Sequence, residues 1–189
     1  MRRLLVAALL AAIVVTLWGA VSWAVLPWHR MVMETVPDGE AVTEALRERV
    51  PGSGLYHYPG AEGGADPDAW MERYRRGPNI NLLVFSATGS DPFSPWLLGR
   101  GFVLNLVAAF LAAALLAAAA PALPGFGSRV LFIALLAGFA ALQSRLVDWN
   151  WWRFPLDYSL VAAFHLVIGW TLAGLVLAWR LNPAGPGSR

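Results

Sequence analysis

The residues suited to acid–base or ligand-binding chemistry are few, and they lie in or beside long apolar segments. His165, Asn105 and Gln143 are polar side chains inside such segments. Polar groups are costly in a membrane-spanning helix and often mark a functional site. Between the last two apolar segments, the stretch VDWNWWRFPLDY (residues 147–158) adds two acids and an arginine. The residues of the predicted polar pocket are His165, Asn105, Gln143, Arg145, Asp148, Arg153 and Asp157.

Each of these residues also has an ordinary structural interpretation. Polar side chains in spans form hydrogen bonds between helices, worth about 0.6 kcal/mol each on average. Arg145 and Asp148 stand three residues apart and are expected to pair on one helical turn. Asp157 begins the last apolar segment, where the helix dipole favours a carboxylate and capping. Arg153 is placed to form an ion pair with either acid or to bind lipid phosphate. The spacing of the two acids is not diagnostic of acid–base chemistry, so no catalytic residue is assigned.

The chain has 3 histidines and no cysteine. Disulfides, thiolate metal sites and thiol catalysis are therefore excluded. A haem in a helix bundle usually needs two facing histidines, and only His29 is able to approach His165. We expect those two residues at different depths, and no HExxH spacing is present. The prediction is no metal and no cofactor. Phosphate loops, nucleophile elbows and dinucleotide fingerprints are also missing from the sequence.

Four apolar segments must position these residues. The composition is 58% hydrophobic and 14% charged, against about 25% charged in soluble domains. A bilayer core of about 30 Å needs about 20 apolar residues in a helix. The predicted spans are residues 4–26, 97–120, 130–147 and 158–181, of which the third is short. The first span resembles a signal peptide in its leading arginines, but its apolar run is long and bulky at the end, so an uncleaved anchor is expected.

Charge distribution predicts the orientation of these spans. With the N-terminus inside, both tails and the loop between the second and third spans carry arginine and no acid, as the positive-inside rule requires. Arg100, Arg145 and Arg153 on the outer side count against it. All 14 basic residues are arginine, which with the high alanine content suggests a GC-rich bacterial genome. The expected location is the bacterial inner membrane, and the positive-inside rule predicts that both termini are cytoplasmic. An aromatic belt at the outer surface is expected from Trp23, Trp28, Trp96, Trp149, Trp151 and Trp152.

A small domain is predicted between the first two spans, over residues 27–96. PDGEAVTEALRERV and DPDAWMERYRRGP read as helices, the second with Asp66 as N-cap and Pro67 at its first position. GLYHYP and INLLVF read as strands, giving either an α+β or a βαβ unit. PGAEGGAD reads as a flexible loop, and the tail at residues 182–189 as disordered. The basic run RYRRGPN is either favourable at a helix end or a contact for anionic lipid or a partner.

Three stretches carry a resemblance: GLYHYPG, WMERYRRGPNINLLVFSATGSDPFSP, and WNWWRFPLDY followed by GWTLAGLVLAW. The chain resembles a group of uncharacterised four-span bacterial membrane proteins with a small extracytoplasmic domain after the first span. The resemblance implies the architecture and no functional residue. The expected fold is an all-α four-helix membrane bundle, N-in and C-in, with an extracytoplasmic α+β domain. Its expected parts are an anchor (1–26), the domain (27–96), a three-helix region (97–181) and the tail (182–189).

Two classes of function fit these features. The first is a non-enzymatic accessory, sensory or assembly module that acts through the extracytoplasmic domain. The second is a small transporter or ligand-binding membrane protein with a polar pocket open to the outer side. An intramembrane enzyme is less favoured. The expected partners are the lipid bilayer and either a membrane protein or a second copy of the chain, and no nucleic acid. No charged residue reaches the inner half of the spans, which argues against a continuous ion path and favours the module.

Overall fold

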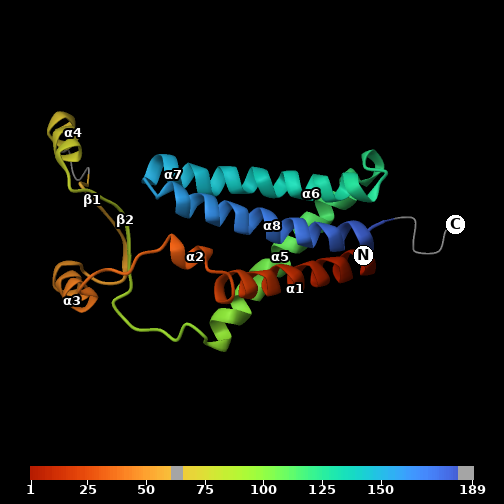
Figure 1. Ribbon diagram of the computed structural model, residues 1–189, viewed down its shortest axis with the longest axis horizontal. Helices are drawn as coiled ribbons and strands as arrows, with labels where there is room; N and C mark the ends of the chain where they lie inside the picture. Colours follow the sequence, from red (N-terminus) through yellow and green to blue (C-terminus); the bar gives the residue numbers. More distant parts are fainter. Residues whose placement is uncertain (61–65, 183–189) are drawn as a thin grey trace. The chain divides into compact units, whose positions relative to one another are not determined.

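The computed structural model describes residues 1–60 and 66–182 (Figure 1). Its helices and strands fall into two compact units, one made of Met1–Glu34 with Pro92–Arg189 and the other of Thr35–Asp91. Residues 61–65 of the expected flexible loop (59–66) and residues 183–189 of the expected disordered tail lie outside the described residues. Each unit is described by itself below.

Four long helical segments make up the first unit. They are α1 (Arg2–Ala24), α5 (Pro95–Ala119) with the short η1 (Ala120–Ala122), a third segment that begins with α6 (Phe126–Ala141), and α8 (Leu156–Arg180). Each is at least 23 residues long and apolar enough to cross a membrane, which takes about 20 residues. The protein is therefore a multi-pass membrane protein with four candidate spans.

The third span is longer than the sequence predicted. It runs from Phe126 to Trp152, or 27 residues, because α6 continues through a π-helical turn, η2 (Leu142–Leu146), into α7 (Val147–Trp152). The stretch VDWNWW was expected to open a loop, and that expectation was wrong. The helix ends at Arg153, whose φ of 59° is left-handed, a common conformation just after a helix end. Only residues 153–155 connect the third and fourth spans.

The four spans pack together in the order α5, α1, α8, α6. Helix α1 contacts both α5 and α8, α8 also contacts α6, and contacts between α5 and α6 are sparse. Alanine dominates the contact surfaces, and small side chains allow close approach of helices in a membrane. Fully or almost fully buried core residues include Ala7, Ala8, Ala11, Ala12, Ala109, Ala113, Leu116, Ile133, Ala173 and Leu177.

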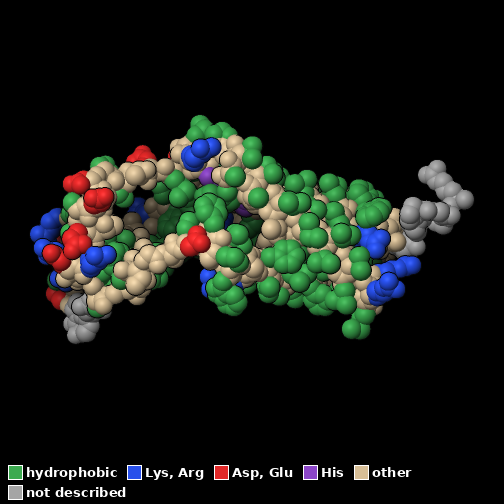
Figure 2. Space-filling view, turned by 90° about the horizontal axis from the view of Figure 1, so that it is seen from below, with side chains coloured by type: hydrophobic (Ala, Val, Ile, Leu, Met, Phe, Trp, Pro, Cys, Tyr) green, Lys and Arg blue, Asp and Glu red, His purple; other side chains and the backbone are tan. Residues whose placement is uncertain are grey.

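Hydrophobic side chains cover most of the visible surface of the long helices, and arginines gather at the end where α1 begins (Figure 2). That end includes the start of α1, with Arg2 and Arg3, and the end of α8, with Arg180. Arg129, in the first turn of α6, is 2% exposed. Its Nε donates to the Leu123 carbonyl at 2.9 Å and its Nη1 to the Leu181 carbonyl at 2.8 Å. This buried guanidinium joins the turn before α6 to the end of α8.

The second unit contains α3 (Gly39–Arg49), β1 (Gly54–Tyr58), α4 (Pro67–Arg76) and β2 (Ile80–Phe85). The predicted order of helix, strand, helix, strand is confirmed. The strands pair antiparallel, with Gly54 opposite Phe85. A βαβ unit needs parallel strands, so the α+β alternative is the correct one. The predicted cap of α4 is confirmed, because the Asp66 carboxylate accepts from the Asp68 amide at 3.0 Å.

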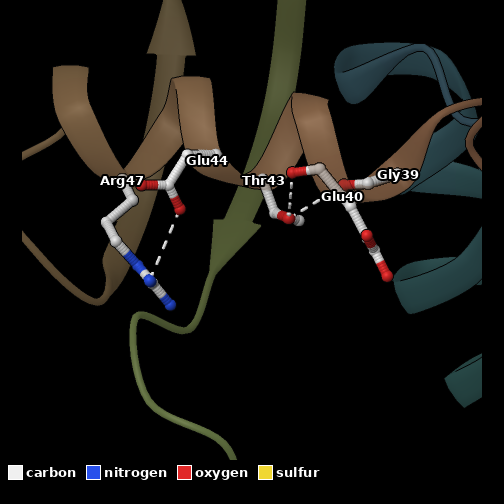
Figure 3. Close-up of polar contacts among 5 residues, drawn as sticks. All are labelled: Gly39, Glu40, Thr43, Glu44 and Arg47. Atoms are coloured by element: carbon white, nitrogen blue, oxygen red, sulfur yellow. Dashed lines mark hydrogen bonds and ion pairs between the residues drawn. The ribbon is translucent and has the colours of Figure 1, made fainter.

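Helix α3 buries none of its residues in this unit. Its polar side chains make contacts within the helix (Figure 3). The Thr43 hydroxyl donates to the Gly39 and Glu40 carbonyls, and Arg47 forms an ion pair with Glu44 at 3.4 Å. Exposed ion pairs of this kind contribute about 0.3–0.5 kcal/mol. The helix is thus held mainly by its own local contacts.

Candidate functional site

Two histidines distant in sequence meet where α1 ends. After Ala24 the chain turns and forms the short helix α2 (Trp28–Met31), which packs against α8. His29 on α2 is 3% exposed, and its ring centroid lies 5.4 Å from that of His165 on α8. The expectation that these residues are separated by depth was wrong, because α2 folds back against the end of α1.

Ser22 joins the two rings. Its Oγ lies 3.0 Å from His29 Nε2 and 2.7 Å from His165 Nδ1, and it accepts from Trp28 Nε1 at 3.0 Å. A hydroxyl has one proton to donate and two lone pairs to accept with. Since Trp28 occupies one lone pair, Ser22 donates to one imidazole and accepts an N–H from the other. The neutral rings therefore play opposite roles.

Two tryptophans of α1 flank this pair of rings. Trp23 stacks on His29 with centroids 3.8 Å apart, and Trp18 stacks on His165 at 6.1 Å. Trp18 Nε1 also donates to the His165 carbonyl at 2.9 Å. The contact depends on Gly169, because a Cβ there would lie 2.6 Å from Trp18 Cδ1. A glycine on α8 thus permits the close approach of α1.

A cavity of about 260 Å³ opens beside the histidine pair. Its lining comes from α1, α2, α5, η2 and α8, all in the membrane unit. The lining residues are Val15, Trp18, Trp23, His29, Asn105, Arg145, Tyr158, Ala162, His165, Leu166, Gly169 and Trp170.

Arg145 reaches this cavity from the π-helical turn η2. Its Nε is buried and has no hydrogen-bond partner. The expected pair with Asp148 does not form in the described chain, where no ion pair joins the two. Single π-helical turns inside α-helices occur frequently at functional sites. This turn therefore places an unsatisfied cation at the cavity.

The predicted pocket residues divide into two sets. His165, Asn105 and Arg145 line the cavity together. Asn105 also donates to Thr16 Oγ1 at 3.1 Å, which is the interhelical hydrogen bond of the structural interpretation. The remaining four residues, Gln143, Asp148, Arg153 and Asp157, do not line it.

Two of that remaining set have local positions that explain them. Gln143 is exposed on the surface of the third span. Asp157 lies in the first turn of α8, as predicted, and its Oδ1 accepts from the Tyr158 amide at 2.8 Å. Neither position requires a ligand.

Burial lowers the pKa of His29 below its usual range, because the ring is largely removed from water. His29 is therefore neutral near pH 7, which fits the sharing of one hydroxyl by two imidazoles. Within residues 1–60 and 66–182, no three histidine or carboxylate side chains gather as a metal-binding group.

The tryptophans of the expected belt occupy two settings. Trp23 and Trp28 belong to the histidine site. Trp96, Trp149, Trp151 and Trp152 are exposed side chains near ends of the spans. Their membrane-interface role stays a prediction.

Several site residues were missed from the sequence. Ser22 is a polar residue near the end of its span, but nothing in its spacing indicates contact with His165. Trp18, Tyr158 and Ala162 carry no signal of their own, because they are common residues of apolar helices. The seven-residue spacing of Ser22 and His29 across LPW, a turn sequence, is the one available hint.

Comparison with known protein families, curated proteins and solved structures finds no match for the chain. The four spans and the α+β insert agree with the architecture that the resemblance implies.

Proposed function

We propose that the protein is a ligand-binding membrane protein, of receptor or transporter type, whose small polar ligand occupies the cavity beside Ser22. The observation that carries this proposal is the cavity of about 260 Å³ with Arg145 and two linked histidines in its wall. Ligand sites are concave, mostly apolar and marked by a few converging polar groups. The stacked tryptophans and aliphatic residues supply the apolar part of this wall.

Hydrogen bonding between helices explains only part of the site. It accounts for Asn105 with Thr16 and for Ser22 with its three partners. It does not account for Arg145, whose Nε is buried and makes no hydrogen bond. A cation held in a membrane span without a partner is costly. A bound ligand would supply the hydrogen-bond acceptor that the protein does not provide.

We further propose that the cavity opens toward the outside of a bacterial inner membrane. Support comes from Arg2, Arg3, Arg129 and Arg180, which lie at the end of the bundle where α1 begins, whereas Ser22 lies near the other end of α1. Clustered arginine in short flanks favours the cytoplasmic side. This orientation places both termini inside.

Filling the cavity tests the proposal without removing any polar group. Ala162 lines the cavity on α8, and Leu160 on the same helix is exposed and does not. After mild-detergent purification and mass spectrometry, a small molecule should accompany the wild type and Leu160→Phe but not Ala162→Phe. Retention of the same species by Ala162→Phe, or none by the wild type, counts against the cavity as a binding site.

The second candidate is the accessory, sensory or assembly module. One observation favours it: Leu55 and Val84 face each other across β1 and β2 and are 64% and 75% exposed. An apolar cross-strand pair in water suits a partner surface. Replacing both by lysine should abolish co-purification of a membrane protein partner or of a second copy. An unchanged set of co-purified chains would contradict this candidate.

A further inference from the structure

We infer that the group recognised in the cavity is an oxyanion, a carboxylate or a phosphate, held by the Arg145 guanidinium. This inference rests on the proposed function, since it names the class of ligand for the same cavity.

The charges around the cavity have one sign. Its titratable lining residues are Arg145, His29, His165 and Tyr158, and no aspartate or glutamate lines it. The nearest acids along the chain are Asp148 on α7 and Asp157 on α8, and neither forms an ion pair with Arg145 within the described residues. A cation with no protein counter-charge attracts an anion.

Arg145 also has an unused set of donors. A guanidinium presents five N–H groups in a fixed planar fork. None of them donates to a protein acceptor in the described chain, and Nε is fully buried. Carboxylate and phosphate oxygens accept two parallel hydrogen bonds from such a fork. A neutral ligand leaves the charge of this half-buried side chain uncompensated, whereas an oxyanion neutralises it.

Further donors lie in the same wall. Tyr158 lines the cavity, and within residues 1–60 and 66–182 its hydroxyl makes no hydrogen bond. Ser22 occupies one nitrogen of each histidine, and the imidazole that accepts from Ser22 carries its proton on the other nitrogen. The histidine pair therefore keeps one N–H that Ser22 does not use. These groups offer a second point of contact to an anion held by Arg145.

The size of the cavity limits the ligand. Its volume of about 260 Å³ lies below the range of about 300–1,000 Å³ usual for drug-sized ligands. It fits a small organic acid, inorganic phosphate or the headgroup of an anionic lipid. The shared chemistry is the oxyanion, and the experiment separates a free solute from a lipid.

The first experiment measures thermal unfolding of the purified protein in neutral detergent. Sodium acetate and sodium phosphate are the soluble probes, with sodium chloride at equal ionic strength as reference. Mixed micelles with phosphatidylglycerol or phosphatidylcholine form the lipid arm. The unfolding midpoint of the wild type should rise with a soluble oxyanion or with phosphatidylglycerol, and the half-saturating concentration should be at least tenfold higher for Arg145→Gln. Arg145→Lys, which keeps the charge and loses the fork, should fall between them.

The second experiment needs no substitution, so it stands even if Arg145→Gln does not fold. Phenylglyoxal modifies arginine, and peptide mass spectrometry reports each site separately. The effective probe should slow modification of Arg145 at least tenfold. Arg153, which is exposed and does not line the cavity, should be modified at an unchanged rate.

The inference is overturned if no oxyanion protects Arg145, or if wild type and Arg145→Gln respond equally. In that case retention of a neutral molecule that Ala162→Phe loses would leave the proposed function intact. If no oxyanion protects Arg145 and no small molecule is retained by the wild type, both the inference and the proposed function are wrong.

Discussion

Ser22 shows how one hydroxyl organises the site at the scale of single residues. It accepts from Trp28 and connects His29 with His165, which brings α1, α2 and α8 together. Removing the hydroxyl leaves His29 Nε2 and His165 Nδ1 without this partner, whereas Trp28 Nε1 keeps the Ser22 carbonyl at 3.3 Å. An unsatisfied polar group costs about 1–3 kcal/mol.

The prediction is that Ser22→Ala lowers the free energy of unfolding by about that amount, measured by titrating the purified protein from mild detergent into a denaturing one. Ser159→Ala is the matched control. Ser159 is 1% exposed and its Oγ has no hydrogen-bond partner, so its replacement should leave stability unchanged or slightly raised. Equal losses for the two variants would show that Ser22 is not a hub.

His29 should make stability depend on pH. Burial lowers its pKa in the folded protein, so below about pH 6.5, the usual histidine value, the unfolded chain binds a proton that the folded one does not. Stability therefore falls as pH decreases from above 6.5 toward the folded pKa.

Unfolding midpoints of the wild type between pH 7.5 and pH 5.5 should decline more steeply than those of His29→Gln. His57→Gln, at an exposed position on β1, controls for loss of a histidine elsewhere. Parallel curves for wild type and His29→Gln would rule out this contribution.

At the scale of elements, the contact between α1 and α8 depends on Gly169. Alanine there would bring its Cβ to 2.6 Å from Trp18 Cδ1, which forces Trp18 away and strains its hydrogen bond to the His165 carbonyl. Overpacking of this kind costs about 1–3 kcal/mol. Gly169→Ala should lower stability by that amount in the same denaturation assay.

Gly19, one residue from Trp18, has open space around it, so Gly19→Ala should be neutral or stabilise the helix by up to about 1 kcal/mol. A loss at Gly19 as large as that at Gly169 would mean that alanine is harmful in these helices for a reason other than the clash.

The spans could be predicted from hydropathy because each needs about 20 apolar residues. The end of the third span could not, since VDWNWW reads equally well as a loop and as a helix end. The sequence also does not predict which side of each span faces the cavity. The spans are apolar all round, so helical periodicity does not tell the cavity side from the lipid side. His165, Asn105 and Arg145 were found because polar residues are rare in spans.

Two features of the site could not be predicted from the sequence. Helix α2 is held against the end of α1 by hydrogen bonds of Trp28 and His29 to Ser22, and the turn sequence LPW between them is only a weak local hint of that pairing. Gln143 and Arg145 both belong to the π-helical turn η2, and only Arg145 lines the cavity. A sequence with ordinary helical propensity carries no mark of an extra residue in one turn, so both features appear only in three dimensions.

At the scale of the whole membrane unit, Arg129 connects two helices at the end opposite the cavity. It links the turn after α5 to the last carbonyl groups of α8, where the helix dipole also favours a cation. Hydrogen bonds from charged groups contribute about 1.5–3 kcal/mol each. The prediction is that Arg129→Ala lowers the free energy of unfolding by at least about 2 kcal/mol.

Arg129→Lys should recover part of that loss, because an ammonium reaches one carbonyl but not both. Arg180→Ala is the control, since the Arg180 Nε has no hydrogen-bond partner and its side chain lies over exposed Trp179. If Arg180→Ala cost as much as Arg129→Ala, general loss of positive charge at this end would explain both.

We propose that the cavity holds a small ligand. The most direct test is the number of small molecules bound per chain in protein extracted with its surrounding membrane by an amphipathic polymer, without detergent. Native mass spectrometry of wild type and Ala162→Phe measures it. We expect close to one bound species per wild-type chain and none for Ala162→Phe. Identical occupancy in the two proteins, or an empty wild type, would contradict it.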